Sequence, residues 1–164
     1  MAEATSDEEK IISLLARMPM LKMFEKEQLR QVLAYTKIRR YDLGDTIIEE
    51  GQNDQTLFFL ITGNVYVVKN GVNIGEFKST GDIFGEMSII DGSVRSASIV
   101  AGGKSLCMSI SASFFENAGN EQQTLMCQNI LFRAIAQILA ERLRAMNQDN
   151  IDLRKEIESL KSGR

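Results

Sequence analysis

The chain has 164 residues, 44% hydrophobic and 25% charged, and is long enough to bury a core as one domain. Its formal net charge of −3 argues against nucleic-acid or membrane-surface partners, and no apolar run is long enough to span a bilayer. The sequence contains no histidine, which excludes Ser-His-Asp and Cys-His catalysis and histidine-based metal sites, so we expect no enzyme and no metal. Cys107 and Cys127 have no motif spacing, so we expect reduced thiols and a cytoplasmic protein.

The first part of the chain is predicted to be helical after a short polar terminus. Residues 1–8 are small, polar and acidic, and are expected to be disordered. Between residues 9 and 36 apolar side chains recur at helical spacing, and Pro19 divides the pattern, which predicts two short helices. We expect residues 9–164 to form a single domain that opens with these helices.

Between about residues 36 and 111 the periodicity changes from helical to alternating. The runs TIIEE, TLFFLIT and VYVVK, which begin at Thr46, Thr56 and Val65, predict short strands. Glycine-containing turns separate these runs, and Asn70-Gly71 is a strong two-residue hairpin signal. Many short strands at even spacing predict a mainly β fold, a jelly-roll β-barrel that closes its own edges, with helices following over about 112–161.

The most informative segment is FGEMSIIDGSVRSASI, residues 84–99, which carries an acid and a base within an apolar stretch. A short helix can begin after Gly85, and a helix start presents free N–H groups that attract anions. A turn at Asp91-Gly92 can bring back Arg95, whose guanidinium suits phosphate oxygens, while Glu86 can accept a hydrogen bond from a sugar hydroxyl. Two interpretations are open: a structural ion pair at the barrel rim, or a site for a phosphate beside a ribose. The glycine, the helix start and the small residues after the arginine favour the second.

This segment closely resembles the phosphate-binding cassette of cyclic-nucleotide-binding domains, of the catabolite activator and protein kinase A regulatory-subunit type. The shared pattern is F-G-E, a short apolar helix, then R-S-A followed by a strand. The resemblance implies that Glu86 holds the ribose 2′-hydroxyl and that Arg95 clamps the cyclic phosphate, helped by nearby backbone amides. It favours cAMP as the ligand, with cGMP possible because Ser96 permits either base. The candidate ligand-binding residues are Phe84, Gly85, Glu86, Met87, Ser88, Arg95, Ser96, Ala97, Val67 and Asn147.

The C-terminal helix carries a second pattern. Apolar residues alternate at spacings of four and three over residues 139–160, with Asn150 at an a position, which is typical of a coiled coil. This favours a parallel homodimer through residues 139–160, and a helix lying on its own barrel is the alternative. In the family this helix also reaches the base, through hydroxyl residues in the catabolite activator. Met146 and Asn147 stand at the matching positions, and only Asn147 can still donate and accept hydrogen bonds.

Together these features predict a non-catalytic cyclic-nucleotide sensor that couples binding to movement of its C-terminal helix. It would signal through an unknown downstream protein, without a cofactor, nucleic acid or membrane partner. No helix-turn-helix follows the long helix before Arg164, so the resemblance to a transcription factor covers the sensor alone. The alternative is a degenerate domain of the same fold that acts as a dimeric adaptor without nucleotide.

Overall fold

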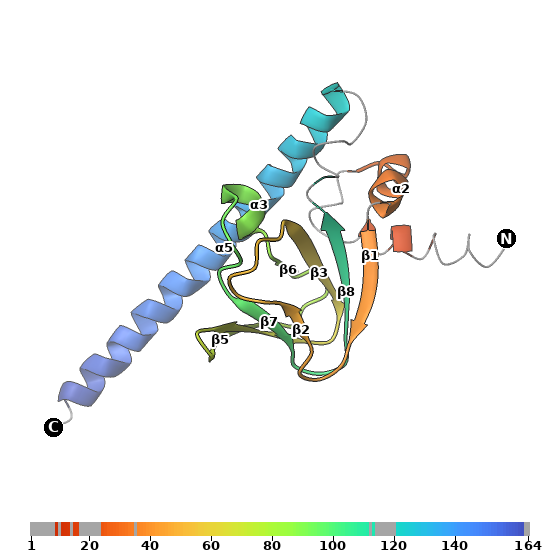
Figure 1. Ribbon diagram of the computed structural model, residues 1–164. Coiled ribbons are helices and arrows are strands. Elements are labelled where there is room, and N and C mark those ends of the chain that lie inside the picture. The colour runs from red at the N-terminus through yellow and green to blue at the C-terminus, as the bar shows by residue number, and fades with distance from the viewer. Residues whose placement is uncertain are drawn as a thin grey trace.

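A computed structural model of the chain describes residues 9, 11–13, 15–16, 24–34, 36–111, 113 and 121–162. The predicted disordered segment 1–8 and the helix break at Pro19 lie outside these residues. Within them, the polypeptide forms two packed sheets with helices along one side (Figure 1).

Eight antiparallel strands form two four-stranded sheets, ordered β1-β8-β3-β6 and β2-β7-β4-β5. This is the predicted jelly-roll fold. Among the described residues no strand pair joins one sheet to the other, so edge strands such as β1 remain where we had expected closure to remove them. The strands are β1 (Thr36–Tyr41), β2 (Thr46–Ile48), β3 (Thr56–Thr62), β4 (Val65–Lys69), β5 (Val72–Phe77), β6 (Ile83–Phe84), β7 (Ser98–Ala101) and β8 (Ser105–Ser111).

Three helices are described with bounds: α2 (Lys26–Ala34), α3 (Met87–Asp91) and α5 (Glu121–Ser162). The last has 42 residues and is therefore about 60 Å long. Figure 1 shows that α5 passes beside α3 and that its C-terminal part projects away from the strands. No helix in the described part of the chain combines the length and apolarity needed to cross a membrane.

Strand β3 is buried on both faces between its terminal threonines, which explains why its five central residues, LFFLI, are all apolar. Leu57 and Phe59 face the helices, where they share a core with Ile135 of α5. Phe58 and Leu60 point the other way, into the core between the two sheets. The domain therefore has two apolar layers, and α5 is attached to the barrel through the outer one.

The structure confirms the strand TLFFLIT and the hairpin between β4 and β5. Asn70 and Gly71 have φ values of 50° and 76°, the left-handed conformations that a two-residue hairpin turn of this kind requires. The strand predicted at 46–50 is shorter than expected and ends at Ile48. One reason is that the N–H of Glu50 donates to the hydroxyl of Ser98 at 2.9 Å instead of to a strand carbonyl.

Candidate functional site

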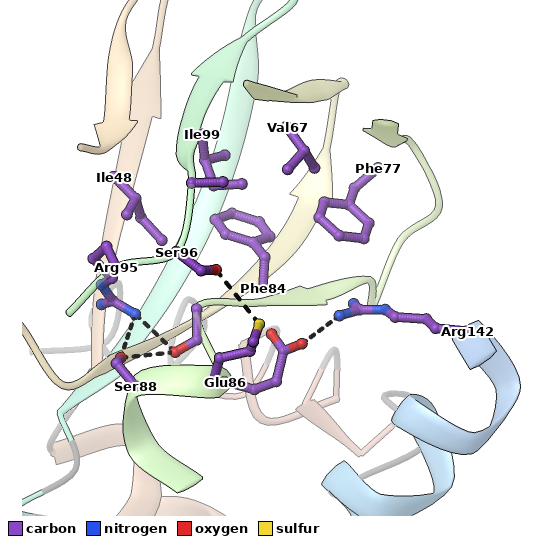
Figure 2. Close-up of a pocket in the computed structure, with 13 residues that line it drawn as sticks. Ile48, Val67, Phe77, Phe84, Glu86, Ser88, Arg95, Ser96, Ile99 and Arg142 are labelled. Carbon is purple, nitrogen blue, oxygen red and sulfur yellow. Dashed lines mark hydrogen bonds and ion pairs between the residues drawn. The ribbon is translucent and has the colours of Figure 1, made fainter. Parts of the chain in front are cut away.

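A pocket of about 130 Å³ opens at the end of the two-sheet core, beside α3 and α5 (Figure 2). Every residue predicted to bind ligand lines it except Asn147. Figure 2 shows apolar side chains forming one wall, with Arg95 and Arg142 approaching from opposite sides. The full lining is Ile48, Val67, Phe77, Phe84, Gly85, Glu86, Met87, Ser88, Arg95, Ser96, Ala97, Ile99 and Arg142.

Three aromatic rings are stacked in parallel at the pocket, two of which, Phe77 and Phe84, line it. The ring of Phe84 lies between Phe58, at a centroid distance of 5.4 Å, and Phe77, at 5.8 Å. The guanidinium of Arg142 stacks on the outer ring of Phe77 at 4.7 Å, and that of Arg95 lies 6.0 Å from the ring centre of Phe58. A continuous column of packed groups therefore joins the two arginines.

Arg95 is almost completely buried, with 3% of its surface exposed, and its terminal nitrogens are fully used. Nη1 donates to the carbonyl of Gly85 at 2.7 Å and to the hydroxyl of Ser88 at 2.9 Å. Nη2 donates to the carboxylate of Asp54 at 2.5 Å and to the carbonyl of Thr56 at 2.7 Å. This network holds the guanidinium in one orientation, and the ion pair offsets the cost of burying its charge.

The remaining donor of Arg95 is left without a partner. Nε is buried and makes no hydrogen bond to any residue that the structure describes. A buried donor without an acceptor costs about 1–3 kcal/mol, so such groups are rare in folded proteins. Because Arg95 lines the pocket, an acceptor bound there could satisfy Nε.

Gly85 makes the close approach of Arg95 possible. Its φ of +79° is a left-handed conformation that glycine adopts without strain. A Cβ at this position would lie 2.6 Å from Nη1 of Arg95 and 2.9 Å from the carbonyl oxygen of Thr56. The residue before the predicted glutamate therefore has no room for a side chain.

Asp54 is the counter-ion of Arg95. Partial burial by itself raises the pKa of the Asp54 carboxyl, but hydrogen bonds from Arg95 and Thr56 and the positive charge of Arg95 outweigh it. The pKa therefore lies below the ordinary value of 3.8, and the carboxylate is charged at neutral pH.

Glu86 is also buried, and it pairs with the C-terminal helix. It occupies the N-cap position of α3 but makes no side-chain cap bond. Its Oε1 accepts a hydrogen bond of 2.6 Å from Nη1 of Arg142, whose other terminal nitrogen donates to the carbonyl of Ile83. Only 7% of the Glu86 side chain and 29% of the Arg142 side chain are exposed. The predicted ribose-binding carboxylate is thus held by a residue 56 positions further along the chain.

The C-terminal helix reaches the pocket at a different residue from the one predicted. Asn147 is exposed and lines a separate surface groove with Asn150, Ile151 and Arg154. Among the described side chains of α5, Arg142 lines the pocket. The two positions are about 7.5 Å apart along a helix and about 140° apart around it, so they cannot face the same pocket.

Sequence reasoning missed Asp54 and Arg142, the two charged partners of the predicted site. Neither belongs to the cassette, and neither stands at a spacing from Arg95 or Glu86 that indicates contact. Their pairings bridge 41 and 56 residues along the chain. Asp54 stands two residues before strand β3, and that position alone does not show that its carboxylate pairs with Arg95.

The cysteine and metal expectations concern residues away from this pocket. Cys107 is a free, buried thiol, and burial raises its pKa to about 11, so it stays protonated at neutral pH. The side chain of Cys127 lies outside the described part of the chain. Among the residues described, no group of acidic or cysteine side chains could hold a metal ion.

The family model described as the cyclic nucleotide-binding domain matches residues 38–122. The curated relatives that resemble the chain include a cGMP-dependent protein kinase and a regulatory subunit of a cAMP-dependent protein kinase. The cGMP-dependent protein kinase 2 of Homo sapiens is 32% identical over 103 residues, which are 60% of this chain and 14% of the kinase. The cAMP-dependent protein kinase regulatory subunit of Aspergillus niger is 40% identical over 83 residues, which are 49% of this chain and 19% of that protein. The chain thus spans a small part of either relative.

The fold also matches solved structures. A crystal structure of a cyclic nucleotide-binding domain from Methylobacillus flagellatus superimposes with a TM-score of 0.69 at 26% identity, covering 86% of this chain and 80% of that one. The family match ends at residue 122, so it includes Asp54, Glu86 and Arg95 but not Arg142.

Proposed function

Because the chain belongs to the cyclic nucleotide-binding domain family, we propose that it is a non-catalytic sensor that binds a cyclic nucleotide in this pocket. We expect the ligand to be cAMP, with cGMP as the second candidate. The relatives that resemble the chain include proteins named as cAMP-dependent and as cGMP-dependent. The observation that carries the proposal is the buried Nε of Arg95, which has no acceptor among the described residues.

Arg95 is proposed to bind the cyclic phosphate through Nε. Its Nη atoms already bond to Gly85, Ser88, Asp54 and Thr56, so they position the group and leave one donor for the ligand. A phosphate oxygen would accept from Nε and share the positive charge with the carboxylate of Asp54. Charge-assisted hydrogen bonds of this type are worth about 1.5–3 kcal/mol each.

Glu86 is proposed to bind the ribose 2′-hydroxyl through its second oxygen. Arg142 donates to Oε1, and no residue in the described part of the chain donates to Oε2. A carboxylate has lone pairs for several donors, so the hydroxyl can bind without displacing the arginine. Ligand and α5 would then meet at the same carboxylate.

This shared carboxylate supports coupling between nucleotide binding and the C-terminal helix. Arg142 attaches α5 to the pocket through Glu86 and through the ring of Phe77. A nucleotide that stabilises this contact favours the docked position of α5, and by linkage the docked helix favours the nucleotide to the same extent.

The exposed end of α5 is proposed to form a parallel homodimer. Its apolar side chains are largely exposed, from 47% for Ile151 to 69% for Leu160. They include Leu143, Met146 and Leu153, which continue the same heptad pattern. A second copy of the helix would cover them. We place the dimer in the cytoplasm, acting on a downstream protein.

A dimeric adaptor that binds no nucleotide is the second candidate. The observation in its favour is the ion pair itself, because the carboxylate expected to hold ribose already has a charged partner in Arg142. In this case Arg142 would fill the pocket permanently and hold the domain in one state.

Calorimetric titration with cAMP and cGMP distinguishes the two candidates. We expect saturable binding of at least one nucleotide, and at least about tenfold weaker binding for Arg95→Ala, which removes the phosphate donor. Arg95→Lys keeps the charge beside Asp54 but lacks Nε, so it should also bind weakly while the domain stays folded. Glu86→Gln should lose less nucleotide affinity than the Arg95 variants, because it weakens a hydrogen bond to a neutral hydroxyl. Absence of binding to the parent protein would favour the adaptor, and full affinity in both Arg95 variants would refute the phosphate assignment.

A further inference from the structure

A second polar pocket, of about 230 Å³, lies on residues of β1, β2, β3 and β8. It shares no lining residue with the nucleotide pocket. Its polar side chains are two cations and four hydroxyl groups: Lys37, Arg39, Tyr41, Thr56, Ser109 and Ser111.

The two cations lie on the face of β1 that is turned toward the other sheet, where apolar side chains are expected. Lys37, Arg39 and Tyr41 alternate along the strand and therefore point to the same side of the sheet. In the ladder Arg39 lies opposite Cys107, which is part of the core between the sheets. Lys37 and Arg39 thus extend the inner face of the sheet, yet both are exposed, so this end of the interior is open to solvent.

Among the described residues the pocket is lined by positive charge without a carboxylate. No described acid lines it and neither cation makes an ion pair with a described residue, although Asp45 lies near enough to Tyr41 to contribute to the raised pKa of its phenol. The carboxylate of Asp54 accepts a hydrogen bond from the hydroxyl of Thr56, which lines the pocket. Its negative charge is already paired with Arg95. Two cations two residues apart on a strand are about 7 Å from each other and repel.

We propose that this pocket binds a small phosphate-bearing anion, either inorganic phosphate or a phosphomonoester. A tetrahedral phosphate can accept from an ammonium, from a guanidinium fork and from a hydroxyl at the same time. Here these donors are Lys37, Arg39 and the phenol of Tyr41, which the Arg39 guanidinium faces. Such a ligand would neutralise the two cations and fill the open end of the barrel.

Edge protection is the competing explanation for the charges. Strand β1 lies at the edge of its sheet, and charged side chains on edge strands prevent pairing with other chains. Arg40 is also exposed on the same strand but does not line the pocket. It therefore offers a matched control, because Arg40→Gln removes the same charge from the same strand.

The test is an NMR titration of the full chain with inorganic phosphate, at ionic strength held constant with chloride. We expect saturable amide shifts at 37–41 and 109–111, separate from any shifts around Arg95. Arg39→Gln alone should bind at least about fivefold more weakly and the double variant with Lys37→Gln at least about tenfold more weakly, whereas Arg40→Gln, which removes one charge like Arg39→Gln, should change affinity less than about twofold. These side chains are exposed, so melting temperatures should stay close to that of the parent.

Three outcomes would overturn the proposal. They are equal weakening by Arg40→Gln, identical shifts produced by chloride, and phosphate shifts confined to residues 85–97. Each would mean that Lys37 and Arg39 protect the edge strand β1 from pairing and do not bind phosphate. The residue-resolved shifts keep this result separate from the nucleotide proposal, which can succeed or fail on its own.

Discussion

Replacing Arg142 by glutamine tests whether α5 takes part in nucleotide binding. The substitution keeps a hydrogen-bond donor but removes the charge that pairs with Glu86 and stacks on Phe77. Both charges of the pair are largely withdrawn from water, so the bond is worth about 1.5–3 kcal/mol, with about 0.5–1 kcal/mol more from the ring contact. Much of the local attachment of α5 should therefore be lost.

The effect on the nucleotide follows from charge. Without Arg142, Glu86 is an uncompensated buried anion in a pocket that must accept an anionic phosphate. Two unit charges on the order of 8 Å apart interact by about 2 kcal/mol at an effective dielectric constant near 20, and the open pocket reduces this to about 1 kcal/mol. We expect cAMP to bind about five- to tenfold more weakly to Arg142→Gln.

The assay is calorimetry with cAMP, together with hydrogen exchange of the amides of residues 138–146. Arg144→Gln is the matched control, since Arg144 is exposed on the same helix and does not line the pocket. Subtracting its effect removes the contribution of net charge. We also expect cAMP to slow exchange in this part of α5 in the parent protein and less so in Arg142→Gln. Unchanged or tighter binding by Arg142→Gln would refute the reasoning, and tighter binding would mean that Arg142 competes with ribose for Glu86.

Two further predictions concern the Arg95 network. Gly85→Ala should cost about 1–3 kcal/mol of stability and also weaken nucleotide binding, because the new methyl group collides with Arg95. Gly92→Ala is the control, since its φ of +67° gives similar strain with nothing within 4 Å, and denaturant unfolding that shows equal losses would contradict the collision. The lowered pKa of Asp54 stabilises the fold above pH 3.8, and this contribution disappears as the pH falls through the folded-state pKa. The difference in melting temperature between the parent and Asp54→Asn should therefore shrink between pH 5 and the lower pH at which Asp54 is protonated, and a constant difference would contradict it.

Features set by near neighbours in the chain were predictable from the sequence. The strand TLFFLIT follows from its β-branched and aromatic composition, and the Asn70-Gly71 hairpin and the short helix after Gly85 follow from backbone conformations that one or two residues determine. The cassette itself was recognisable because Glu86 and Arg95 are nine residues apart on either side of one turn. Their placement in a common pocket needed little information from outside that segment.

The partners of those two charges were decided by the tertiary structure. Asp54 and Arg142 meet Arg95 and Glu86 across 41 and 56 residues, and no local spacing encodes such contacts. A helical period shows which residues of α5 share a face, but only packing of the outer core against Ile135 sets how the helix is rotated and shifted along the barrel. That rotation and shift bring Arg142 to the pocket and leave Asn147 exposed, because a displacement of five residues turns a side chain well away from its target.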